Sequence, residues 1–244
     1  MAVRAPAFAL VVLIAAALTV ALRAPAAWVG DWLAARSNLR LIDARGTVWA
    51  GSALLGVSNG RETTLVPGRL EWRVERITTN ALTARLRHPW LVAPFDVSLG
   101  AQAMRVDKGR AQVPAALLVA AGAPFNTLRP GGVLEITWTD TELKGGALRG
   151  EVQVDWRDAR SALSTIVPLG SYRLRIAGTG GAPSLDLQTL HGPLHMRGTG
   201  RISGSHLKFS GVASAEPAMQ PALNGLLGLL GMRSGDKVVL AIDT

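Results

Sequence analysis

The chain has 244 residues, enough for one domain of ordinary size with a substantial core. It contains no cysteine, which excludes disulfides, thiolate nucleophiles and thiolate metal sites. Its 26 lysines and arginines exceed its 17 acids and give a formal charge of +9, a balance that suits nucleic acid or anionic lipid as a partner. The basic residues occur singly, however, and there is only one tyrosine, so the pattern favours a solvated basic face over a nucleic-acid interface.

Residues 5–27 are predicted to form a membrane anchor. No charged side chain occurs from Ala5 to Leu22, and a helix of that length is about 27 Å long, close to the roughly 30 Å hydrocarbon core of a bilayer. Trp28 and Trp32 follow, and indole rings favour the headgroup zone. A cleaved signal peptide is the alternative, because Ala24-Pro25-Ala26 loosely resembles a cleavage site, although the apolar run is longer than a usual signal core.

The distribution of charged residues around this anchor does not decide its orientation in the membrane. Arg4 precedes the apolar run, whereas Arg23, Arg36 and Arg40 follow it, so a simple positive-inside count puts the large domain in the cytoplasm. That rule weakens for long translocated domains and does not decide the orientation.

After the anchor, apolar and polar residues alternate in one segment after another, which is typical of strands with one buried face. Leu70, Trp72 and Val74, for example, alternate with charged residues. Further runs with this pattern are 82–86, 95–99, 134–138, 152–156, 172–176, 185–187, 194–196, 207–209 and 238–242. The sequence therefore predicts about a dozen short strands.

Glycine and proline pairs such as Pro67-Gly68 and Gly145-Gly146 separate these runs. Because the connections are short, the strands are expected to be antiparallel neighbours. A sheet with one apolar face must cover that face by folding on itself or on a second sheet. The predicted fold class is mainly β, with an N-terminal transmembrane helix and a curved, meandering antiparallel sheet, either half-barrel or sandwich-like.

Two short helices are also predicted, Val113–Ala121 and about Ala218–Met232. Met219 and four leucines form one stripe of the second helix, the leucines being Leu223, Leu226, Leu227 and Leu230. Such a stripe favours packing against the sheet, with a partner protein or a membrane surface as the alternative.

No constellation of residues predicts a catalytic, cofactor or metal site. His191 and His195 have the i, i+4 spacing of helical metal ligands, but Gly192-Pro193 lies between them, and in a strand they would stand roughly 13 Å apart. His88 and His206 do not match the spacing of any catalytic triad motif. The sequence therefore predicts a protein that is not an enzyme and carries no cofactor.

Several motifs, taken in order, resemble the type II secretion system protein N family. Gly46-Thr47-Val48-Trp49-Ala50-Gly51 is similar to the family's usual Gly-Thr-Val-Trp-Ser-Gly, with Ala50 in place of the serine. Other segments that agree are 67–72, 150–156, 167–172, 192–194, 198–200 and 226–231. The resemblance covers the chain nearly from end to end.

The resemblance implies a single-pass inner-membrane protein with a short cytoplasmic tail (1–4), an anchor (5–27) and a periplasmic β-domain (28–244). It implies a component of the machine that moves folded proteins from the periplasm across the outer membrane. The expected partners are other inner-membrane and secretin-associated subunits, with lipid as a further one and without nucleic acid. The family brings no catalytic residues to this chain.

The candidate site residues are those of the motif, namely Gly46, Thr47, Trp49 and Gly51. The two glycines permit tight backbone approach, and Trp49 is expected to be buried in the space beside them, with partner recognition as its alternative role. A different class of function also stays open, because curved one-sided sheets on a membrane anchor describe AsmA-like envelope proteins that bind or transport lipid in an apolar groove.

Overall fold

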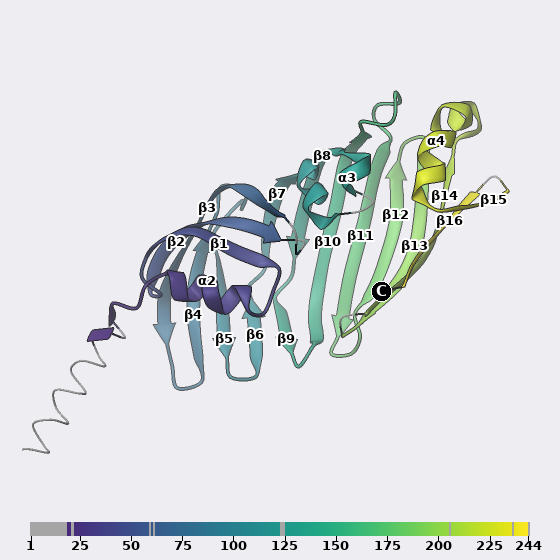
Figure 1. Ribbon diagram of the computed structural model, residues 1–244. Helices are drawn as coiled ribbons and strands as arrows, with labels where there is room; N and C mark the ends of the chain where they lie inside the picture. Colours follow the sequence, from purple (N-terminus) through teal and green to yellow (C-terminus); the bar gives the residue numbers. More distant parts are fainter. Residues whose placement is uncertain are drawn as a thin grey trace, which may run out of the picture.

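The computed structural model describes residues 19–243 except 21, 59, 61, 123–124, 205 and 236. Within this part of the chain, sixteen strands form a single open antiparallel sheet accompanied by a few short helices (Figure 1). The prediction of a mainly β protein with a meandering antiparallel sheet is confirmed. The sheet is neither a closed barrel nor a two-sheet sandwich in the described residues, since β1 and β15 stand at its two ends.

Most strands pair with their neighbours in the chain, as short turns require. The strands are β1 Leu39–Gly46, β2 Ala50–Ser58, β3 Thr63–Ile77, β4 Ala81–Arg87, β5 Phe95–Gly100, β6 Ala103–Val106, β7 Gly109–Pro114, β8 Pro130–Trp138, β9 Thr141–Lys144, β10 Ala147–Ser161, β11 Gly170–Thr179, β12 Ser184–His191, β13 Leu194–Ser203, β14 His206–Ala215, β15 Met232–Ser234 and β16 Lys237–Asp243.

The strand count exceeds the expected dozen partly because two long strands are interrupted. β6 and β7 pair with β9 and β8 respectively, and β8 and β9 both pair with successive parts of the long strand β10. A break of two residues separates the members of each pair, at 107–108 and at 139–140. The strand pairing therefore continues across the middle of the sheet on both sides of each break.

The alternating pattern places apolar side chains on one face, here called the inner face, and charged side chains on the other, the outer face. On β11, for instance, Leu174 and Ile176 lie opposite Leu187 and Leu185 of β12. Short helices lie at both ends of the sheet and beside β8 in its middle (Figure 1). They are α2 Ala27–Ala34, η1 Ala115–Ala121, α3 Phe125–Leu128, η2 Pro217–Met219 and α4 Gln220–Leu230.

At the first end, the sheet bends around α2 (Figure 1). Ala26, Ala53 and Trp72 form a buried cluster here, the N-terminal cluster, against which Val29 of α2 and Leu86 of β4 also pack. The 3₁₀ helix η1 contacts the neighbouring strands β2 and β3 and also β8, which is distant from both in the strand order of the sheet. The sheet is thus curled back on itself at this end.

At the other end, α4 connects β14 to β15 and packs on β14 and β16. The leucine stripe of α4 lies here: Leu223, Leu226 and Leu227 are buried, and Leu230 is partly buried. They pack with residues of the sheet in a second buried group, the C-terminal cluster, which includes Tyr172, Leu194, Ala213 and Val238.

The two predicted helices are present with shifted ends. The first begins at Ala115 because Val113 and Pro114 still pair with β8 as the end of β7. The second ends at Leu230, and Met232 begins β15. Helix α2 was not predicted, because residues 27–34 adjoin the apolar run and lack a clear apolar stripe of their own.

The expected tail and most of the expected anchor, residues 1–18 and 21, lie outside the described residues. In the part that is described, no helix has the length and apolar character needed to cross a membrane.

Candidate functional site

The family-like motif forms the turn between β1 and β2, where Gly46 pairs with Gly51. The Thr47 N–H donates to the Ala50 carbonyl at 2.9 Å, and the Ala50 N–H donates to Thr47 Oγ1 at 3.2 Å. Gly46 has a φ of +86°, and a Cβ at this position would lie 2.5 Å from the Ala50 carbonyl oxygen. Both the conformation and the space therefore require glycine.

At Gly51 a side chain is excluded for a different reason, because the ring of Trp72 occupies the space where it would lie. A Cβ at position 51 would lie 2.5 Å from that ring, and the Trp72 Nε1–H donates to the Val48 carbonyl at 3.2 Å. Trp72 is 7% exposed. The strand pattern places Trp72 on the inner face, but only the pairing of β2 with β3 brings it to Gly51.

Trp49, expected to be buried beside the glycines, is instead partly exposed on the turn. Its carbonyl accepts a hydrogen bond from the Val74 N–H at 2.7 Å. The ring that lies against Gly51 is that of Trp72, because the pairing of β2 with β3 places Trp72 directly opposite Gly51.

The motif turn also binds the segment that precedes α2. The Ala26 N–H donates to the Gly46 carbonyl at 3.1 Å, and the Val48 N–H donates to the Ala24 carbonyl at 2.9 Å. Ala24 and Ala26 are both buried. The turn therefore fixes the start of the described domain, directly after the uncharged run of the sequence, to the first hairpin of the sheet.

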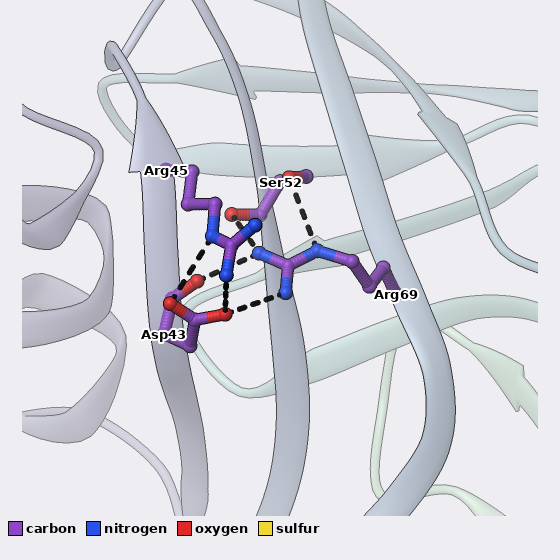
Figure 2. Close-up of polar contacts among 4 residues, drawn as sticks. All are labelled: Asp43, Arg45, Ser52 and Arg69. Atoms are coloured by element: carbon purple, nitrogen blue, oxygen red, sulfur yellow. Dashed lines mark hydrogen bonds and ion pairs between the residues drawn. The ribbon is translucent and has the colours of Figure 1, made fainter.

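A polar cluster stands next to this turn on β1, β2 and β3 (Figure 2). One Asp43 carboxylate oxygen accepts from guanidinium nitrogens of both Arg45 and Arg69 at 2.8 Å, and Arg69 also donates to the Asp43 carbonyl at 2.7 Å. Arg69 Nε donates to Ser52 Oγ at 3.3 Å. These bonds, first to Arg69 and then to Arg45, hold the pKa of Asp43 below its ordinary value.

Asp43 lies at a bulge, where the register of β1 and β2 shifts between Ile42 and Arg45 and Asp43 itself has a φ of +51°. The arginines satisfy the carboxylate and the carbonyl that this irregularity exposes. The arrangement suits a structural brace across three strands, since the carboxylate is held ionised by two cations.

The outer face carries further pairs of this kind, so several of the arginines that the sequence shows singly are paired across strands. They include Arg85–Asp96, Arg105–Glu142, Arg157–Glu135, Arg173–Asp155 and Arg175–Glu151. Hydrogen bonds from the partner arginine lower the pKa values of Asp96, Asp155 and Glu151.

The inner face between the two clusters is apolar and only partly covered. A row of cross-strand neighbours runs through Leu82, Leu99, Met104, Leu143 and Leu148 on five strands. Met104 in the middle of this row is 36% exposed, and Leu143 beside it is 40% exposed. A row of partly exposed apolar side chains therefore crosses the middle strands of the sheet near their hairpin turns.

The histidines do not converge on a site. His191 and His195 lie exposed on β12 and β13, and His195 faces Glu216 at 3.8 Å. Among the residues that the structure describes, no group of three or more histidine, aspartate or glutamate side chains could hold a metal ion.

Neither a curated protein nor a solved structure matches this chain. A comparison with protein families matches residues 37–240 to type II secretion system protein N. The matched range contains the motif turn, the polar cluster of Asp43, and all sixteen strands apart from the last residues of β16. Because this match covers most of the chain, the protein belongs to the type II secretion system protein N family and is a component of type II secretion, with other subunits of that system as its partners.

Proposed function

We propose that the protein is a non-enzymatic scaffold of the type II secretion system, anchored in the inner membrane by residues 5–27, with its sheet in the periplasm. The observation that carries this proposal is the bonding of Ala24 and Ala26 to the motif turn. A segment that directly follows an apolar run of membrane-spanning length is joined by backbone hydrogen bonds to the first hairpin, so the sheet would begin within a few residues of the membrane surface.

A non-catalytic role agrees with how the ionisable side chains are used. Asp43, Asp155 and Glu151 are each held by arginine along the outer face, Asp155 as a buried carboxylate and the other two as partly exposed ones. General acid–base catalysis needs groups poised to gain or lose a proton near neutral pH. Carboxylates with lowered pKa values serve instead to hold strands together.

Reporter fusions and membrane extraction test the topology. Reporters placed after Gly60, in the β2–β3 connection, and after Thr244 are expected to be active in the periplasm. Carbonate washing is expected to leave the full chain in the membrane. Cytoplasmic activity of both fusions, or release by carbonate, would contradict the proposed anchor.

The half-exposed inner face supports a second candidate function, binding of lipid acyl chains. The apolar row centred on Met104 crosses several neighbouring strands. Such a surface would shield lipid hydrocarbon from water. A scaffold with a filled core would not need such a surface.

Lipid extraction from the purified full chain tests this candidate. Met104→Glu would put a charge in the middle of the apolar row and is expected to reduce the amount of lipid that co-purifies. Thr199→Glu, an exposed outer-face position on β13, is the matched control and should leave it unchanged. Equal lipid in both variants, or none in the unsubstituted protein, would exclude the inner face as a lipid site.

A further inference from the structure

Helix α2 displays large aromatic side chains on its solvent face. Trp28 is 53% exposed and Trp32 48% exposed, and the two lie one turn apart on the same side of the helix. Arg36, one turn further on, stacks over the Trp32 ring with its guanidinium carbon 4.8 Å from the ring centre. The stripe of Trp28, Trp32 and Arg36 is here called the indole stripe.

The helix cannot rotate to bury this stripe, because its opposite side is fixed to the sheet. Gly30 is buried against Leu41 of β1. The end of the helix is held by Arg40, whose guanidinium donates to the Ser37 carbonyl at 2.9 Å and to the Ala34 carbonyl at 3.3 Å. The indole stripe is therefore held outward by the docking of α2.

The chemistry of the stripe fits the headgroup layer of a bilayer. Indole rings are amphipathic and favour the boundary between hydrocarbon and water, and a guanidinium pairs with lipid phosphate. Asp31 is also exposed on this side of α2, so the helix would lie at the level of the headgroups without entering the hydrocarbon. The location agrees, since the uncharged run ends at Leu22, a few residues before Trp28.

We propose that the indole stripe of α2 lies on the surface of an anionic bilayer and sets the orientation of the sheet relative to the membrane. This inference rests on the proposed membrane anchor. The anchor alone would leave the sheet free to tilt about the chain that leaves the membrane. Contact through α2, which is docked on β1, would give the whole sheet a defined orientation.

Single introduced cysteines test this contact directly, because the chain contains none and each label is therefore unique. The full chain would be placed in vesicles of phosphatidylcholine with phosphatidylglycerol and labelled with an environment-sensitive fluorophore at Trp28→Cys or Trp32→Cys. Thr165→Cys, exposed in the β10–β11 loop, is the control position. Labels at 28 and 32 are expected to emit at shorter wavelength than the label at 165 and to resist quenching by acrylamide.

A second set of variants tests the role of the indoles and of the anionic lipid. A label at Ala35→Cys, on the same exposed side of α2, is expected to lose its protection from acrylamide when Trp28→Ser and Trp32→Ser are combined. Omitting phosphatidylglycerol is expected to weaken the protection at all three positions. Circular dichroism would verify that these exposed substitutions leave the sheet intact.

Carbonate extraction of the same samples separates this inference from the anchor. If the chain resists extraction but the labels at 28 and 32 behave like the label at 165, the indole stripe does not contact the membrane and the inference is wrong. If carbonate releases the chain while those labels are protected in untreated vesicles, the surface contact stands and the anchor is wrong. Release together with unprotected labels would overturn both.

Discussion

Trp72 is the side chain on which the packing of the motif turn depends, so Trp72→Ala should destabilise the N-terminal cluster strongly. The indole covers Gly51 and bonds to the Val48 carbonyl. Its removal would leave a cavity between β2 and β3 and an unpaired carbonyl in the turn. Both effects act on the hairpin that binds Ala24 and Ala26.

The expected cost follows from the burial of this ring. A tryptophan buries about 150–250 Å², which at about 25 cal/mol per Å² corresponds to about 4–6 kcal/mol of transfer free energy. The alanine methyl group keeps part of this transfer free energy, whereas the cavity left by the ring adds to the destabilisation. We therefore expect the free energy of unfolding to fall by about 3–5 kcal/mol. Trp49→Ala should cost only about 1–2 kcal/mol, because Trp49 is already partly exposed in the folded protein.

Hydrogen exchange measured by mass spectrometry on the full chain is the appropriate assay, because the two buried clusters occupy opposite ends of the sheet. A loss of 3–5 kcal/mol corresponds to exchange faster by about two to four orders of magnitude for amides that open with the N-terminal cluster. Peptides from β1 to β3 should show this acceleration, whereas peptides from α4 and β14 should not.

Trp72→Phe serves as the matched control, since it retains an aromatic ring but removes the N–H donor. It should lie between the unsubstituted protein and Trp72→Ala. The reasoning would be refuted if Trp49→Ala accelerated exchange in β1 to β3 as much as Trp72→Ala, because the turn tryptophan would then be the one that holds the cluster.

Three further predictions concern the other end of the sheet and the ionisable groups. Leu223→Asp should unfold the C-terminal cluster, because a charge would replace a fully buried side chain. Leu229→Asp, at a position 52% exposed on the same helix, should be tolerated. Thermal unfolding of the two variants distinguishes these outcomes. Asp155→Asn should cost about 1–3 kcal/mol, since the buried carboxylate accepts two 2.7 Å bonds from Arg173. Because its pKa is lowered in the folded protein, the stability from Asp155 is present above its ordinary value of 3.8 and is lost as the pH falls below that value, so acid titration of stability should be shallower in the variant. Replacing His191, His195 and His206 together by glutamine should leave secretion of substrate proteins nearly unchanged; a folded, membrane-bound variant that fails to secrete would contradict the non-enzymatic role.

The amino-acid sequence by itself determined the strands, their faces and the places where the chain turns. Alternation with a period of two is a local property, so runs such as Leu70-Trp72-Val74 predict a half-buried strand without knowledge of its neighbours. The glycines of the motif also predict tight backbone approach, because that requirement belongs to the residue type. At the interruption between β8 and β9 the alternation shifts from Leu134-Ile136-Trp138 to Leu143, but this shift alone does not say which strands the two segments pair with.

Which residues meet was decided only by the tertiary structure. The choice of Trp72 over Trp49 beside Gly51 depends on the register between β2 and β3, and the pairing of Arg173 with Asp155 depends on the register between β10 and β11. The docking of α2, and with it the outward position of Trp28 and Trp32, depends on contacts with β1. These outcomes come from residues brought together across strands, whereas the sequence pattern reports only what each segment does alone.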